Sequence, residues 1–208
     1  MPPGRRNCAA VRQDVDDNGN KGELSMALVA SIHVDLGWEL PDMELQTPDG
    51  ENVRLRESMG ENGLLVAFTC NHCPYALAVW PRLIKQAAIL NGMGVNTIAV
   101  NPNIHPDFPE DSMPVMQQKI KEWGIDFPYL ADTSQDVARS FDAQCTPDLY
   151  LFDKAGRLYY HGRIDDYWKD EAKVKQQELI PAAEALVVGK PAPQPQHPTI
   201  GCSIKWKG

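Results

Sequence analysis

Two cysteines separated by two residues are the strongest chemical signal in this sequence. Cys70 and Cys73 enclose Asn71 and His72, and Pro74 follows directly. Such a pair between a strand and a helix favours thiol–disulfide exchange, because the unpaired N–H groups at the start of the helix stabilise a thiolate. We expect Cys70 to attack as the thiolate and Cys73, one helical turn later, to resolve the mixed disulfide.

His72 is expected to tune this chemistry. A histidine between the cysteines supplies a donor or a positive charge to the thiolate, which stabilises the reduced form and makes the disulfide more oxidising. Zinc or copper(I) binding by the same thiolates and imidazole is an alternative. The five cysteines include no second Cys-x-x-Cys that would complete a structural zinc site, so the pattern favours redox use.

The segments around the motif predict a buried strand leading into a helix. Residues 64–68 are a short apolar run that is typical of a central parallel strand covered on both faces. Residues 75–90 carry apolar side chains through several helical turns, with Pro81 expected to kink or end the regular hydrogen bonding. Residues 95–100 predict a second buried strand.

The other segments alternate between strand and helix signals. Residues 47–50, Thr-Pro-Asp-Gly, are a turn between two alternating segments, 43–46 and 53–56, and predict a β-hairpin. This order indicates an α/β fold with a mixed sheet. The remaining predicted elements are a Pro-rich loop at 101–111, helices at 112–123, 134–141 and 171–188, a strand at 127–130, and a hairpin of 149–153 with 157–163.

Length and composition predict one folded domain with irregular ends. The chain has 208 residues, of which 43% are hydrophobic, so it can bury a core without a disulfide framework. Residues 1–25 are polar and are predicted to be a disordered leader, which contains Cys8. Residues 26–188 form the predicted domain, and residues 189–208 a Pro-rich tail that packs on it.

The net charge of -8 argues against two classes of partner. No basic stripe is present, so we expect neither nucleic acid nor an anionic membrane as a partner. Residues 1–25 lack the charged start and apolar run of a secretory signal, and no run reaches the roughly 20 apolar residues of a membrane span. We therefore expect a cytoplasmic monomer or homodimer.

Four separated blocks, in this order, resemble the thioredoxin-like superfamily. They lie at residues 68–74, 129–130, 145–148 and 201–206. Over about residues 36–207 the chain is similar to the redoxin (AhpC/TSA) branch, and specifically to its largely uncharacterised bacterial proteins with a C-N-H-C-P motif. The resemblance implies a three-layer α/β fold with a mixed central sheet, helices on both faces and an N-terminal β-hairpin extension. It also implies an antioxidant or oxidoreductase activity on protein or small-molecule disulfides and thiols, with no cofactor and no resident metal.

The resemblance further assigns a substrate-binding loop. Thr146 and Pro147 match the pair that holds a cis peptide facing the dithiol and offers backbone groups to an extended substrate. Cys145 would then lie near the dithiol, and Cys202 could fold back as a further redox thiol. The alternatives are that Cys145 is a small buried apolar residue and that Cys202 packs in a terminal clamp.

The predicted function is a thiol-disulfide oxidoreductase, and two alternatives stay open. One is a thiol peroxidase using Cys70, although peroxiredoxins need threonine or serine three residues before the reactive cysteine, where this chain has Ala67. The other is a copper or zinc module using Cys70, Cys73 and His161. Thr69 and Ala67 also replace the tryptophan and the buried acid that are usual in thioredoxins.

Overall fold

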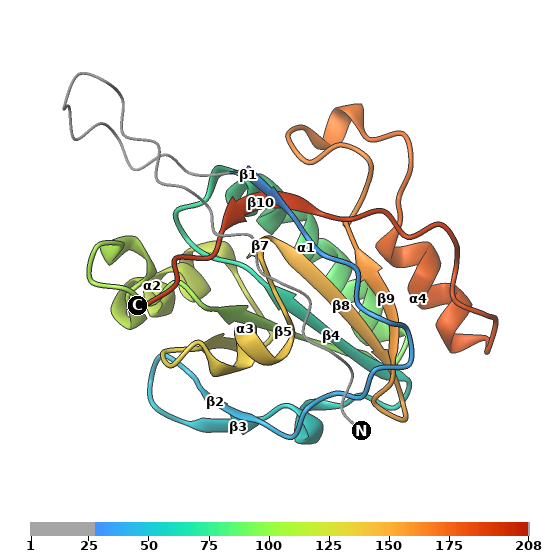
Figure 1. Ribbon diagram of the computed structural model, residues 1–208, viewed down its shortest axis with the longest axis horizontal. Helices are drawn as coiled ribbons and strands as arrows, with labels where there is room; N and C mark the ends of the chain where they lie inside the picture. The colour runs from blue at the N-terminus through green and yellow to red at the C-terminus, as the bar shows by residue number, and fades with distance from the viewer. Residues whose placement is uncertain (1–27, 208) are drawn as a thin grey trace, which may run out of the picture.

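A seven-stranded mixed sheet forms the centre of the computed structural model, which describes residues 28–207 (Figure 1). Its strands are β2 (Glu44–Gln46), β3 (Asn52–Arg54), β4 (Gly63–Phe68), β5 (Val95–Asn101), β6 (Tyr129–Ala131), β8 (Asp148–Asp153) and β9 (Leu158–Gly162). The order is β3-β2-β6-β5-β4-β8-β9. β4 pairs parallel with β5 and antiparallel with β8, so the predicted central strand is confirmed.

The side chains of β4 pack into two separate hydrophobic clusters, one on each face of the sheet. All six of its residues are buried, as the unbroken apolar run predicted. Successive side chains of a strand point to opposite faces. Leu65 and Ala67 accordingly join one hydrophobic cluster, whereas Leu64, Val66 and Phe68 join the other.

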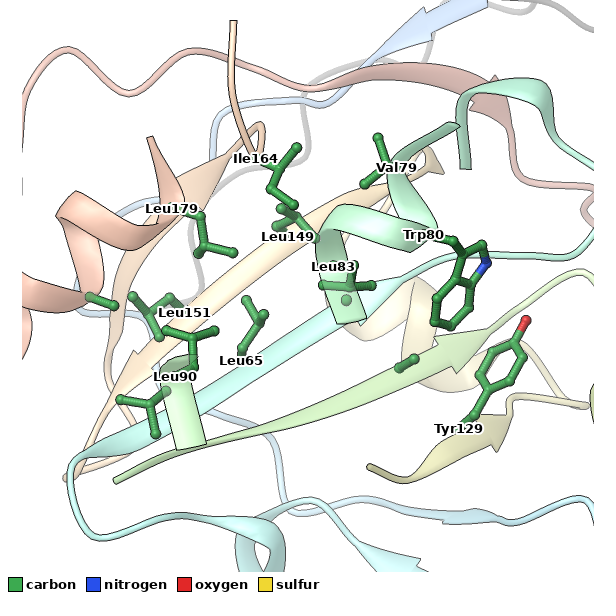
Figure 2. Close-up of a cluster of buried hydrophobic side chains, with 14 of the residues drawn as sticks. Leu65, Val79, Trp80, Leu83, Leu90, Tyr129, Leu149, Leu151, Ile164 and Leu179 are labelled. Carbon is green, nitrogen blue, oxygen red and sulfur yellow. The ribbon is translucent and has the colours of Figure 1, made fainter. Parts of the chain in front are cut away.

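Helices cover both faces of the sheet. They are α1 (Pro74–Gly92), α2 (Met113–Trp123), α3 (Asp136–Ser140) and α4 (Leu179–Val187). Trp80 and Leu83 of α1 and Leu179 of α4 pack with Leu65 in one cluster (Figure 2), and Phe141, directly after α3, packs in the other. The predicted three-layer α/β fold is confirmed.

The start of α1 and the end of α2 follow from local sequence signals. Pro74 is the first residue of α1, where its fixed φ suits a helix and its missing N–H costs nothing. The helix then continues through Pro81 to Gly92, although Pro81 cannot donate to the carbonyl of Leu77. Gly124 ends α2 with φ +65°, the left-handed conformation typical of a helix end.

The predicted helix over residues 171–188 is wrong in its first half. Only a short 3-10 turn, Glu171–Lys173, precedes α4. In the segment between them, the backbone N–H groups of Lys175 and Gln176 donate to the side-chain carboxylate of Asp166. These bonds compete with the helical ones and delay the helix to Leu179.

The predicted N-terminal hairpin is confirmed and extends the main sheet. β2 pairs with β3, and Gln46 of β2 lies opposite Ala131 of β6. A further 3-10 turn, Arg56–Ser58, follows this hairpin. The predicted disordered leader, residues 1–25, lies outside the described residues.

A second, three-stranded sheet was not predicted. It consists of β1 (Leu28–Ala30), β10 (Ile200–Ser203) and β7 (Cys145–Thr146), in the order β1-β10-β7 (Figure 1). All its pairs are antiparallel, and Cys202 lies opposite Thr146. Part of the Pro-rich tail thus forms a strand against the domain.

No helix within residues 28–207 is both long and apolar enough to cross a membrane.

Candidate active site

The Cys-x-x-Cys motif joins β4 to α1. Cys70 lies two residues after the end of β4, and Cys73 is the residue that caps the start of α1. Both side chains are fully buried. The motif therefore has the predicted strand-to-helix setting, in which helical N–H groups point toward its thiols.

Thr146 lies against both thiols. Its Oγ1 is 3.2 Å from the Cys70 sulfur, and its carbonyl oxygen is 3.2 Å from the Cys73 sulfur. The peptide between Thr146 and Pro147 is cis. The structure thus brings together the dithiol and the loop that the sequence singled out from opposite halves of the domain.

A buried carboxylate, Asp111, lies beside the motif and was missed in the sequence. It belongs to the 3-10 turn Pro109–Asp111 and is fully buried. Its Oδ1 accepts from the N–H of Asn71 at 2.6 Å and from the side chain of Asn101 at 3.0 Å. Its Oδ2 bonds with Nδ1 of His72. The acid comes from a loop distant in sequence, so no local spacing revealed it.

The side chain of Asn71, within the motif, makes two hydrogen bonds to neighbouring elements. Its side-chain amide donates to the carbonyl of Glu110 at 2.9 Å, and its oxygen accepts from the hydroxyl of Tyr129 at 2.9 Å. The carbonyl of Cys70 accepts from the indole N–H of Trp80 at 3.1 Å. Backbone and side chains of the motif are thereby held in one arrangement.

His72 is oriented by two neighbours. Its ring stacks on Phe108 with centroids 4.8 Å apart, while Nδ1 faces Asp111. The other ring nitrogen, Nε2, is buried and has no hydrogen-bond partner among the described residues. The potential ligand atoms of Cys70, His72 and Asp111 lie within 4.8 Å of one another.

The two thiols of the motif differ in acidity. Burial, followed by the hydrogen bond with Cys73 and the charge of Asp111, raises the pKa of Cys70 well above its ordinary value. The pKa of Cys73 falls to about 5, because the hydrogen bond from Cys70 outweighs burial and bonds from Cys202 and the Ala76 N–H lower it further. The acid lies beside Cys70, whereas a helical N–H serves Cys73. That Cys70 is the attacking thiol stays a prediction.

The two additional cysteines have different environments. Cys202 packs in one buried cluster with Cys70 and Cys73. Cys145 precedes Thr146 on β7, so its side chain points to the other face of the strand. Burial raises the pKa of Cys145 far above its ordinary value.

His161 does not join the thiols. Its Nε2 is 2.9 Å from Oδ1 of Asp148, and its ring stacks on Tyr150 with centroids 4.1 Å apart. Within residues 28–207, the group of possible metal ligands contains Cys70 but not His161. The predicted copper or zinc site with His161 is therefore not assembled.

The fold and the site define a class. The domain is thioredoxin-like, with a dithiol at a strand-to-helix junction facing a cis X-Pro peptide. The model of the AhpC/TSA family matches residues 36–161, more than half of the chain. The chain therefore belongs to the AhpC/TSA family.

Individual relatives agree with this assignment. The thiol-disulfide oxidoreductase ResA of Bacillus subtilis (strain 168) is 23% identical over 122 residues, which cover 59% of this chain and 64% of ResA, slightly less than two thirds of its length. An uncharacterized conserved protein from Geobacillus kaustophilus is similar with a TM-score of 0.84 and 39% identity, covering 88% of this chain and 98% of that one. A hypothetical protein from Sinorhizobium meliloti 1021 is similar with a TM-score of 0.82 and 37% identity, covering 86% of this chain and 98% of that one.

A more distant structure shares the fold alone. A secreted disulfide oxidoreductase of Mycobacterium tuberculosis has a TM-score of 0.51 and 14% identity, covering 71% of this chain and 96% of that one.

Proposed function

We propose that this protein is a thiol-disulfide oxidoreductase whose redox group is the pair Cys70 and Cys73. One observation carries the proposal: the two buried sulfurs face Thr146 together, and the pKa of Cys73 is lowered to about 5. A thiolate is the reactive form in disulfide exchange, and the lowered pKa of Cys73 favours that form within the pair. The name of ResA and the family supply independent support.

The acidities suggest how the two thiols share the reaction. The Cys70 sulfur attacks a substrate disulfide, and its proton passes to the Cys73 thiolate to which it is hydrogen-bonded. One substrate thiolate leaves, and Cys70 is held in a mixed disulfide. Cys73 then gives its proton to the substrate thiolate that has left, and attacks the Cys70 sulfur. The second substrate thiolate leaves, so the substrate gains two electrons and the Cys70–Cys73 disulfide forms.

The surrounding residues act as positioning groups in this proposal. Thr146 and Pro147 orient an extended protein or small-molecule disulfide beside the pair. Asp111 holds His72 and the Asn71 N–H, and thereby fixes the loop that carries Cys70. His72 is proposed to tune the pair from beside it and not as a direct donor, because Nδ1 faces Asp111 and Nε2 has no hydrogen-bond partner among the described residues.

A glutathione redox titration of the purified, metal-free full chain tests the proposal. We expect a reversible two-electron couple, with Cys70 and Cys73 linked in the oxidised protein by mass mapping. Cys145→Ser is the matched control and leaves the couple unchanged, because Cys145 lies outside the thiol cluster. Cys73→Ser is expected to trap glutathione on Cys70. Absence of any couple across the accessible range would contradict the proposal.

Metal binding is a second candidate, supported by one specific observation. Cys70, His72 and Asp111 offer sulfur, nitrogen and oxygen ligand atoms within 4.8 Å of one another. Nε2 of His72 is buried and has no hydrogen-bond partner within residues 28–207. This donor set suits zinc. Zinc titration of the reduced protein, followed by metal analysis, should show one equivalent bound in the wild type and a large loss in Asp111→Asn. Equal binding by both proteins would exclude this site.

The proposal also includes the subgroup and the location. Membership in the bacterial proteins with a C-N-H-C-P motif is supported by identities of 39% and 37% to two bacterial proteins along 98% of each. The proposed location is the cytoplasm. Cell fractionation tests the location.

A further inference from the structure

The last strand brings a third thiol to the dithiol. β10 lies between β1 and β7, and its residue Cys202 is opposite Thr146, the residue that both motif sulfurs contact. Cys202 is 2% exposed and packs in one cluster with Cys70 and Cys73. Three thiols therefore share one buried space.

The backbone holds Cys202 in this place from both sides. Leu28 of β1 pairs with it on one edge, and Thr146 of β7 on the other. The preceding residue, Gly201, approaches so closely that a Cβ there would lie 2.1 Å from the carbonyl oxygen of Thr146. Only glycine fits this approach, so the position of Cys202 is built into the strand.

Cys73 is the shared partner of the other two thiols. It is hydrogen-bonded with Cys70 and also with Cys202. Burial, then the bond with Cys73 and the charge of Cys73, raises the pKa of Cys202 to about 12. When Cys73 enters a disulfide with Cys70, its negative charge disappears. The oxidised Cys73 sulfur is then a target for attack, and Cys202 lies in the same buried cluster.

We propose that Cys202 exchanges with the Cys70–Cys73 disulfide to form a Cys73–Cys202 disulfide. The Cys202 sulfur attacks the Cys73 sulfur, the Cys70–Cys73 bond breaks, and Cys70 leaves as a thiolate that takes up the proton lost by Cys202. One disulfide replaces another, so no oxidant or reductant is consumed. This step rests on the proposed function, because it starts from the Cys70–Cys73 disulfide.

The exchange gives the oxidised protein two forms. In one form Cys70 is blocked, and in the other it is a thiol again while the two oxidising equivalents are stored at Cys202. Cys145 has no part in this exchange, because its sulfur contacts the carbonyl of Pro147 at 3.7 Å and lies outside the thiol cluster. It therefore provides a matched control on the neighbouring strand.

Tryptic mapping of the oxidised full chain distinguishes the two forms. Cys70 and Cys73 share the peptide of residues 57–82, whereas Cys202 lies in 176–205 and Cys145 in 140–154. A Cys73–Cys202 bond links two peptides, and a Cys70–Cys73 bond links none. The proteins to compare, after equilibration in glutathione buffers and acid quenching, are the wild type, Cys70→Ser, Cys145→Ser and Cys202→Ser.

We expect the disulfide-linked peptides 57–82 and 176–205 in the oxidised wild type. The same linked peptides should be the main product in Cys70→Ser, and their amount should be unchanged in Cys145→Ser. They are lost in Cys202→Ser. If the wild type forms the Cys70–Cys73 bond but Cys70→Ser yields only glutathione adducts at Cys73, this inference is overturned and the proposed function stands. If no variant with an intact motif forms the Cys70–Cys73 bond, the proposed function itself fails. Because Cys70→Ser retains β10, the test does not depend on the folding of Cys202→Ser.

Discussion

The two buried ion pairs along α1 differ in what they can do. Near the start of the helix, His72 bonds with Asp111 beside the thiols. Farther along, Arg82 donates to Asp165 at 2.6 Å, and both side chains are 2% exposed or less. Arg82 also donates to the backbone carbonyls of Ala78, Tyr167 and Trp168.

The difference lies in the cation. A guanidinium stays charged at every physiological pH, so Arg82 holds the loop after β9 on α1 permanently. An imidazole can gain or lose a proton, and His72 keeps Nε2 without a partner near the thiols. One pair therefore serves stability, and the other serves the chemistry of the site.

The largest expected effect comes from Arg82→Met. This change leaves Asp165 buried without its charge partner, which should lower the free energy of unfolding by about 3–5 kcal/mol. Urea denaturation measures it, and Arg82→Met/Asp165→Asn should recover part of the loss. The thiol titration should stay unchanged. A loss below about 1 kcal/mol would show that the pair is not the main support of this loop.

Asp111→Asn should act on both stability and chemistry. It removes a negative charge that raises the pKa of Cys70, so that pKa should fall. Weakened hydrogen bonds to Asn71 and Asn101 should cost about 1–3 kcal/mol. Thiolate absorbance against pH, with denaturation, measures both effects. Asp165→Asn is the control that should change stability alone, and identical thiol titrations in all three proteins would refute the distinction between the pairs.

The reduced protein should become more stable as pH rises from about 5 toward 9. The pKa of Cys73 is about 5 when folded against an ordinary 9.0, so the unfolded state binds the extra proton in this window. The stability from this group is fully present above about pH 9, declines as pH falls through this window with a slope of at most about 1.4 kcal/mol per pH unit, and is gone below about 5. Denaturation of the reduced wild type and of Cys73→Ser at several pH values measures the slope. An equal slope in both proteins would mean that Cys73 does not carry the charge.

The smallest effect is expected from Lys85→Ala. Lys85 pairs with Glu171 at 2.9 Å, but their side chains are 63% and 51% exposed. Solvent screens such a pair, so the change in unfolding free energy should be about 0–1 kcal/mol. This surface pair on α1 is the matched reference for Arg82→Met. A loss as large as that of Arg82→Met would show that burial is not what separates them.

Features with a local cause were predictable from the sequence. The apolar run at 64–68 indicated the central strand. Pro74 marks the start of α1 and Gly124 the end of α2. Each of these signals acts within a few residues. The pairing of β10 with β7 and the delayed start of α4 were not predictable. The pairing depends on backbone partners that are distant in the sequence. The start of α4 depends on a side-chain acceptor, the carboxylate of Asp166, which no helix signal reveals.

The candidate site also has parts that the sequence predicted and parts that it did not. The dithiol and Thr146–Pro147 were found from the motif and the resemblance, and the structure brings them together. The environment of the thiols was not predictable from spacing. Besides burial and the hydrogen bond between Cys70 and Cys73, the charge of Asp111 raises the pKa of Cys70 and a bond from Cys202 lowers that of Cys73, and both residues are distant in the sequence.

The position of β10 has a consequence for protein synthesis. Its residues 200–203 leave the ribosome after all the other elements described here, whereas β4 and α1 emerge early. The chain emerges N-terminus first, so every strand of the main sheet is available before β10. During that interval the thiols of the motif lack their neighbour on β10. The nascent chain is thus expected to pass through a stage in which its dithiol is more open to oxidants and chaperones than in the finished protein.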